Sequence, residues 1–163
     1  MGKFRQSDRY QILPSQESSL SGELQIAFMP IKPVYANRII DGSKKFEFRR
    51  ASIKKKLTHI IIYASSPVKK IIGIAEVDGI DVSCPIETWE NTRHAAGISK
   101  EAFLEYFHGK EKAVTIKLKD ILQLEREICP KEIEDGFKVP QSFKYVHADF
   151  LHDVFAKGRS LAL

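Results

Sequence analysis

Apolar and polar residues follow two periods along the chain, and each period predicts a kind of element. Alternation with a period of two, or a continuous apolar run of strand length, predicts a β-strand, whereas apolar residues three and four apart predict a helix. The strands predicted in this way are 25–29, 44–50, 57–64, 71–82 and 111–122. The predicted helices are 33–41, 85–97, 99–109 and 147–157.

The order of these elements decides the expected fold class. Helices are inserted between strands but do not alternate strictly with them, which argues against a doubly wound parallel sheet. We therefore expect an α+β fold, a small and largely antiparallel β-barrel with helices inserted between its strands. Gly73 and Gly79 interrupt the strand 71–82, so we expect its ladder to bulge or bend at these glycines.

The strand 44–50 carries a charged face. Its two phenylalanines share one side, and Glu47 and Arg49 share the other with a lysine, which predicts a half-buried strand whose charged side faces outward or into a cleft. Lys44 and Glu47 are three positions apart, so they point to opposite faces of an ideal strand. Joint action of these two side chains requires a bulge or loop after Gly42.

The length of the chain fits one globular domain. At 163 residues and 18.6 kDa we expect a single domain over 23–163. Residues 1–22 mix Ser, Gln and scattered charge without a period, as is typical of a flexible N-terminal arm. The chain has neither a GxGxxG nor a GxxxxGK[ST] loop, and we expect no cofactor.

Cysteine and histidine positions argue against a metal site. Cys84 and Cys129 belong to no metal-like or disulfide spacing, and His147 and His152 are five apart rather than on one helix face. We expect two free thiols in a reducing compartment. With no secretory signal and no apolar run of membrane-spanning length, we expect a cytoplasmic protein that does not associate with membranes.

Positive charge is concentrated in one part of the chain. The net charge is +5, but residues 32–56 hold nine Lys and Arg against two acidic residues, a net of +7. The rest of the chain has a net charge of −2. A local concentration of this kind is typical of a phosphate-binding surface, although a solvated strand and loop explain it equally well.

The same region carries a recognisable motif. Residues 31–50, IKPVYANRIIDGSKKFEFRR, resemble the signature of the ASCH domain family, which is related to PUA domains. The stretches 61–67, 97–100 and 140–145 resemble a branch of that family, and the resemblance extends over about 25–146. It implies a PUA-like β-barrel with a positively charged cleft in front of the first helix, and an association with RNA or RNA-derived nucleosides.

A cleft of this kind needs cations and a group that reads or reacts. Glu47 is the expected reader, as an acceptor for a base amino group or as a general base, together with Lys44 as the second catalytic candidate. The alternative role for Glu47 is a salt bridge to Lys45 or Arg49. The full expected ligand-binding set is Lys32, Tyr35, Lys44, Glu47, Arg49, Arg50, Ser65 and Phe143.

Aromatic residues outside this segment are expected mainly in the core. Phe103, Tyr106 and Phe107 share one face of the helix 99–109, and we expect them to pack inward. Phe143 follows Pro-Gln-Ser in a predicted loop. It either plugs the barrel or stacks on a base.

The resemblance also implies two hydrolytic activities. Members that remove an acetyl group from acetylated cytidine use a Lys matched by Lys44, but their Thr is Glu47 here, and the region of their further acid, near 95–96, is Ala-Ala. Members similar to ribonucleases use a Lys, a Tyr and a Ser, for which Lys44, Tyr63 and Ser65 are available.

Three functional hypotheses result from the sequence. The first is a module that binds RNA or a modified nucleotide, and the second is a small hydrolase of the same fold, acting on an acylated nucleoside or on RNA. The third, which the family resemblance alone implies, is a regulatory role in transcription or translation through protein contacts. No feature of the sequence identifies a protein partner.

Overall fold

Six strands form one sheet in the computed structural model, which describes residues 23–159. Along the sheet the order is β2-β5-β4-β3-β1-β6, and every neighbouring pair is antiparallel except β1 and β3. The predicted N-terminal arm, 1–22, lies outside the described residues. The strands are β1 (Ile26–Ile31), β2 (Phe46–Arg49), β3 (His59–Ala64), β4 (Lys70–Ser83), β5 (Ala113–Ile128) and β6 (Lys144–Val146).

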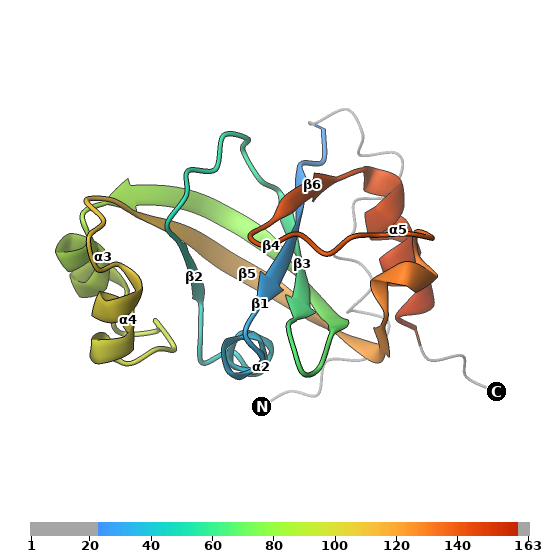
Figure 1. Ribbon diagram of the computed structural model, residues 1–163, viewed down its shortest axis with the longest axis horizontal. Helices are drawn as coiled ribbons and strands as arrows, with labels where there is room; N and C mark the ends of the chain where they lie inside the picture. Colours follow the sequence, from blue (N-terminus) through green and yellow to red (C-terminus); the bar gives the residue numbers. More distant parts are fainter. Residues whose placement is uncertain (1–22, 160–163) are drawn as a thin grey trace.

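The helices are inserted between strands, as the α+β prediction requires. Helices α3 and α4 lie together at one end of the long strands β4 and β5, and α5 lies near the other end (Figure 1). No helix in the described part is long and apolar enough to cross a membrane. The helices are α2 (Pro33–Asp41), α3 (Pro85–Thr92), α4 (Lys100–Tyr106) and α5 (Ala148–Lys157), with a short 3₁₀ helix, η3 (Pro130–Glu132).

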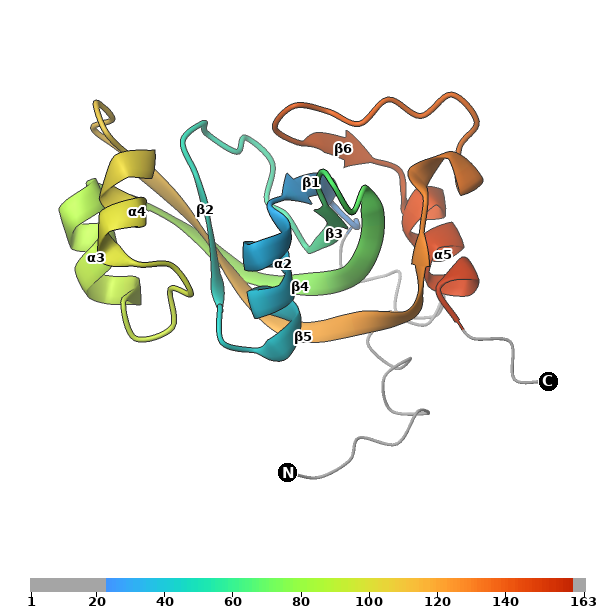
Figure 2. The same ribbon diagram turned by 60° about the horizontal axis from the view of Figure 1, so that its bottom comes forward.

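The predicted barrel is an open, curved sheet. Strands β2 and β6 are its two edges, and both are short, so no backbone ladder closes the circle (Figure 2). The Arg49 side chain on β2 instead donates hydrogen bonds to Pro30 O on β1, at 2.9 Å, and to Ser142 O before β6, at 3.3 Å. Side-chain contacts therefore connect the two sides of the curved sheet.

Both faces of the central strands are buried, which explains their continuous apolar sequence. Ile26 and Phe28 of β1 point to the core shared with α5, whereas Ala27 and Met29 point to the core shared with α2. A third cluster lies at the other end of the molecule, where Phe48, Ala96, Phe103, Phe107 and Ala113 pack together. This third cluster places α4 beside β2.

Most element bounds lie within a few residues of the prediction, but the predicted helix 85–97 was wrong at its end, because α3 ends at Thr92 and residues 95–97 instead accept hydrogen bonds from the segment 38–45. Helix α2 has the predicted bounds, and the register of β4 against β5 shifts at Ile71/Gly73 and Val77/Gly79, which confirms the expected irregularities. Strand β5 extends past the predicted end at 122, passing through Asp120, whose φ is 49°. Strand β6 was not predicted, because a three-residue strand carries too little periodicity to be recognised.

Candidate functional site

Lys44 lies in the loop that joins α2 to β2. Helix α2 ends at Gly42, whose φ is 87°, and the chain then turns so that the Lys44 amide donates to Arg38 O at 2.9 Å. The Lys45 amide donates to Ala95 O at 2.9 Å. Lys44 therefore lies in a loop before β2 rather than in the strand. A loop after Gly42 is the condition under which Lys44 and Glu47 were expected to act together.

The Lys44 ammonium is buried. The residue is 3% exposed, and its Nζ donates to Ala96 O at 2.8 Å. The ring centroids of Phe48 and Tyr35 lie 4.6 Å and 5.5 Å from Nζ. Burial lowers the pKa of Lys44 to about 8, an effect that the nearby Glu47 carboxylate opposes. Lys44 is therefore a stronger acid than an ordinary lysine.

Three consecutive carbonyls hold this region in place. We call residues 95–97 the carbonyl strap, because their oxygens accept from the Lys45 amide, from Lys44 Nζ and, at 2.9 Å, from Arg38 Nη1. Gly97 has a φ of 63°, and a Cβ built on it would lie 2.3 Å from Lys44 Cβ. Only glycine allows the carbonyl strap to approach Lys44 so closely.

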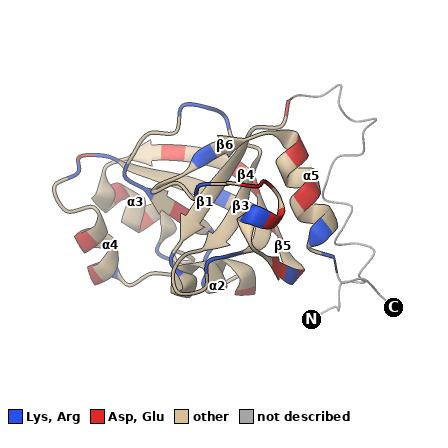
Figure 3. Cartoon of the chain, turned by 45° about the vertical axis from the view of Figure 1, so that its right-hand side comes forward, with Lys and Arg blue, Asp and Glu red and all other residues tan. Residues whose placement is uncertain are grey.

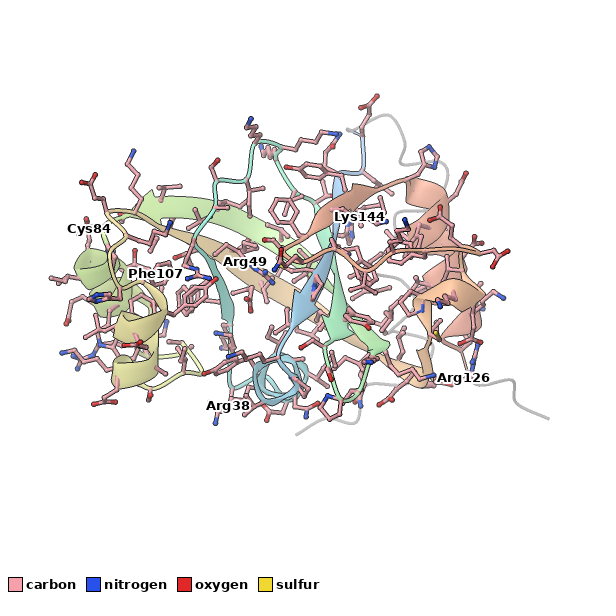
Figure 4. All side chains as sticks on the ribbon, in the orientation of Figure 1. Arg38, Arg49, Cys84, Phe107, Arg126 and Lys144 are labelled. Atoms are coloured by element: carbon pink, nitrogen blue, oxygen red, sulfur yellow. The ribbon has the colours of Figure 1, made fainter. Side chains whose placement is uncertain are left out.

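Glu47 and Arg49 lie on one face of β2 and are buried, at 7% and 9% exposed. Arg49 Nε is 3.5 Å from Glu47 Oε1, which confirms the alternative of an ion pair between these residues. Figure 4 shows the Arg49 side chain extending from β2 towards β1 and β6. The prediction of a half-buried strand was wrong for this face, because the elements joined by the Arg49 hydrogen bonds cover it.

The cluster has hydrogen-bonding capacity that the protein leaves unused. Within the described residues, Glu47 Oε2 and Arg49 Nε are buried and have no hydrogen-bond partner. Buried polar atoms of this kind are rare, since each costs roughly 1–3 kcal/mol. Lys44, Glu47 and Arg49, here the Lys44–Glu47–Arg49 cluster, therefore present one unsatisfied acceptor and one unsatisfied donor at one place.

Tyr106 packs against the third core cluster, as its helical spacing predicted, and it also borders the Lys44–Glu47–Arg49 cluster. Its hydroxyl donates to Phe48 O at 3.3 Å, and the Arg50 guanidinium lies 4.8 Å from its ring centroid. Burial raises the pKa of Tyr106. The positive charge of Arg49 opposes this rise, and the negative charge of Glu47 adds to it. Sequence separation hid this contact, since a periodic pattern does not show which distant strand a helix face covers.

The other predicted ligand-binding residues are more scattered. Lys32 is exposed at the start of α2, and the Ser65 amide donates to Ile31 O at 2.9 Å, beside that helix start. Phe143 is half-buried and packs edge-on against Tyr145, with ring centroids 5.5 Å apart. The contact fits the barrel-plug alternative, while its neighbour Ser142 contacts Arg49.

The grouping of Lys44, Tyr63 and Ser65 does not occur. Tyr63 packs against Phe28 in the core shared with α5, at a centroid distance of 5.2 Å. Tyr35, which is close to Lys44, packs against the other core, on the α2 side of the sheet. Tyr35 and Tyr106, rather than Tyr63, are the tyrosines near the cluster.

Two surface hollows of about 440 Å³ lie away from the cluster. Between β6 and α5, one hollow is lined in part by three acidic residues, Glu134, Asp149 and Asp153, and by one basic residue, Lys144, and we call it the acidic hollow. The other is lined in part by Lys45 and Asp81. Neither lining includes a residue of the Lys44–Glu47–Arg49 cluster, and all three of its residues are less than 10% exposed, so they form a buried polar cluster rather than the wall of an open cleft.

Metal-binding groups are not assembled in the described residues. Within 23–159, no three His, Cys, Asp or Glu side chains are placed so that they could hold a metal ion. His147, one of the two histidines singled out in the sequence, accepts a hydrogen bond from the Asp149 amide at 3.1 Å and begins α5.

Comparison with known proteins identifies relatives of both sequence and fold. The ASCH domain family model matches residues 29–122. The ASCH domain-containing ribonuclease of Zymomonas mobilis is 32% identical over 130 residues, which cover 76% of this chain and 85% of that protein. The crystal structure of ASCH from Zymomonas mobilis has a TM-score of 0.75 at 31% identity, covering 80% of this chain and 94% of that one.

A more distant match extends the fold comparison. The N-terminal domain of Staphylothermus marinus McrB has a TM-score of 0.59 at 13% identity, covering 83% of this chain and 96% of that one, which shows the shared fold alone. The family match covers more than half of the chain, and the Zymomonas mobilis relative matches most of its own length. The chain belongs to the ASCH domain family, within the PUA-like superfamily.

Proposed function

We propose that this protein binds RNA, or a nucleotide derived from RNA, at the Lys44–Glu47–Arg49 cluster. The observation that carries the proposal is the buried Glu47 Oε2, which has no partner among the described residues although two cations flank it. A nucleotide supplies what is missing, because its base edges carry both donors and acceptors and its phosphate accepts from cations. Glu47 is suited to accept from an exocyclic amino group.

Cleavage of RNA is the second candidate function. Two observations favour it: the 32% identical relative is named a ribonuclease, and burial makes Lys44 a stronger acid than an ordinary lysine. In this reaction the 2′-oxygen bonds to the adjacent phosphorus while Glu47 takes its proton. The bond from phosphorus to the 5′-oxygen breaks, and Lys44 gives that oxygen a proton. The products carry a 2′,3′-cyclic phosphate and a 5′-hydroxyl.

Deacylation of a nucleoside has less support. At positions 95–96, where the related amidohydrolases are expected to place an acid, this chain has two alanines whose carbonyl groups accept from the Lys45 amide and from Lys44 Nζ. These carbonyl oxygens position Lys44 and Lys45 but cannot serve as a general base. A panel of acylated nucleosides tests this activity beside RNA.

Binding is tested with a neighbouring pair of lysines. Lys44 is buried in the cluster, whereas Lys45 is exposed, so Lys44→Met and Lys45→Met each remove one positive charge from adjacent positions. We expect Lys44→Met to weaken binding of single-stranded RNA about tenfold or more, because a charge-assisted hydrogen bond contributes about 1.5–3 kcal/mol. Lys45→Met should weaken it less than about threefold. Equal effects in two folded variants would reject the proposed site.

Cleavage is tested by comparing an RNA strand with a DNA strand of the same sequence. The reaction above requires the 2′-hydroxyl, so we expect cleavage of RNA alone. Mass spectrometry of the fragments should find the cyclic phosphate end. Fragments with a different end, or cleavage of DNA at an equal rate, would contradict this reaction.

Cellular location and regulation extend this proposal. Cys84 and Cys129 are free, which suits a reducing compartment, and we propose the cytoplasm. A regulatory role in transcription or translation would follow from selective RNA binding. Pull-down of bound RNA from cells, compared between the wild-type protein and Lys44→Met, tests that role.

A further inference from the structure

The basic segment 32–56 divides into two parts in the structure. Lys44 and Arg49 are buried in the cluster, and Arg38 donates to Gly97 O. Its remaining positive residues are exposed: Lys32, Lys45, Arg50, Lys54, Lys55 and Lys56. Three of these are consecutive and form the turn between β2 and β3, which we call the lysine loop (Lys54–Lys56). The charge excess is therefore partly buried at the site and partly displayed beside it.

The lysine loop is attached to the segment that contacts Arg49. The Lys55 amide donates to the Tyr145 hydroxyl at 3.3 Å, and Lys55 Nζ lies 4.6 Å from the centroid of the same ring. Tyr145 in turn packs against Phe143, next to Ser142, whose carbonyl accepts from Arg49. A continuous series of contacts thus leads from the lysine loop to the Lys44–Glu47–Arg49 cluster, and aromatic rings lie along it.

Charge is distributed unevenly around this region. In residues 23–159, no ion pair joins the lysine loop to a carboxylate. Three acidic residues and Lys144 line the acidic hollow beside α5, and Figure 3 shows the acidic residues on α5 and the basic loop between β2 and β3. A polyanion that reaches the cluster is attracted on the lysine-loop side and repelled on the α5 side.

We propose that the lysine loop binds the phosphate backbone of a single-stranded RNA whose recognised nucleotide occupies the Lys44–Glu47–Arg49 cluster. The inference rests on the proposed function and narrows its ligand to a strand of several nucleotides rather than a free nucleotide. From Arg49 in the cluster to Lys54 in the lysine loop the chain spans at most about 18 Å, so both parts reach one short strand. Basic residues interleaved with aromatic rings are typical of single-strand binding surfaces.

The test compares two triple variants with equal charge. The first is Lys54→Gln, Lys55→Gln and Lys56→Gln. The control, Lys69→Gln, Lys131→Gln and Lys157→Gln, removes three exposed lysines from the β3–β4 turn, from η3 and from the end of α5. Binding of a labelled single-stranded RNA of about ten nucleotides is measured over a series of salt concentrations. Melting temperatures verify that both variants are folded.

The expected result is a change in salt dependence. Each phosphate contact to a single strand contributes about −0.7 to the slope of log K against log salt, so loss of three contacts makes the slope shallower by about 2. The control should keep the wild-type slope, and a mononucleotide should bind all three proteins alike. Equal slopes for the two triple variants would overturn the inference.

Failure of the proposed function looks different from failure of this inference. A wild-type protein that binds neither the strand nor a mononucleotide rejects the proposed function itself. Wild-type binding that the lysine-loop variant retains rejects only the strand path. A variant that loses mononucleotide binding as strongly as strand binding also overturns the inference, because the lysine loop would then act on the cluster rather than on the strand.

Discussion

Lys44 keeps an ammonium group where water has little access. Among residues 23–159 its one hydrogen bond runs to Ala96 O, and the rings of Phe48 and Tyr35 lie beside the group. Desolvation favours the neutral amine, while Glu47 favours the charged form, and the resulting pKa is about 8. At neutral pH the lysine is charged but close to losing its proton, which suits both anion binding and proton donation.

RNA binding should therefore change at a pH where ordinary lysines do not titrate. Lys44 is protonated below its pKa of about 8 and neutral above it. Raising the pH from about 7 to about 9 should weaken binding by up to about tenfold, through loss of one charge-assisted contact. Fluorescence anisotropy measures this change. The step should be absent from Lys44→Met, and a step of the same size in that variant would assign it to another group.

Gly97 positions Lys44 through the carbonyl strap. Gly97→Ala combines a strained φ of 63° with a Cβ in the space of the Lys44 side chain. Gly109→Ala is the matched control, because Gly109 has a φ of 75° but nothing within 4 Å of the added Cβ. Both substitutions should cost about 1–2 kcal/mol of unfolding free energy for the left-handed backbone, with a further loss in Gly97→Ala.

RNA binding should separate these two glycine variants. Gly97→Ala should bind RNA about tenfold more weakly, since the ammonium is displaced, and the pH step assigned to Lys44 should move. Gly109→Ala should bind like wild type. Urea unfolding and anisotropy on the same samples measure both quantities, and equal affinities for the two variants would remove the positioning role of Gly97.

Strand β2 and its covering elements build the cluster together. Glu47 and Arg49 face inward on β2, while Phe48 between them packs on Phe103 of α4, with ring centroids 4.9 Å apart. Packing of α4 therefore fixes the strand that carries the charged pair. The loop before β2 supplies Lys44, and the carbonyl strap lies between α3 and α4.

A substitution on α4 should weaken the fold through this packing. Phe103 is fully buried, so Phe103→Ala should cost about 3–5 kcal/mol of unfolding free energy. The neighbouring Leu104 is 41% exposed, and Leu104→Ala should change it by less than about 1 kcal/mol. Urea denaturation of the two variants measures the difference. Similar losses of unfolding free energy in the two variants would mean that packing of the Phe103 face does not hold α4 in place.

The sequence pattern could predict the elements better than their contacts. Alternation identified which residues of β2 share a face, and the continuous apolar run identified β3 as central. The alternation could not show that the face of β2 with Glu47 is buried, because the segments that cover it, at Pro30 and Ser142, are distant in the sequence. Lys44 and Ala96 are likewise 52 positions apart, and no local pattern connects them.

For the molecule as a whole, the location of the charged residues says more about a polyanionic ligand than the net charge does. The net +5 combines a basic segment with a slightly acidic remainder. In the structure, part of the basic segment is buried with Glu47, and the lysine loop displays another part at the surface, whereas acidic residues of α5 line the acidic hollow. This arrangement favours approach of a polyanion from one side, which is the basis of the proposed strand path.

The central claim is that Glu47 takes part in recognising RNA, and its most direct test uses the sign of one charge change. Glu47→Gln removes a negative charge, so if Glu47 only repelled phosphate, RNA would bind the variant more tightly. The exposed Glu105→Gln on α4 is the control. By anisotropy at fixed salt, we predict that Glu47→Gln binds single-stranded RNA about tenfold more weakly and that Glu105→Gln binds like wild type. Unchanged or tighter binding by a folded Glu47→Gln variant would contradict the account.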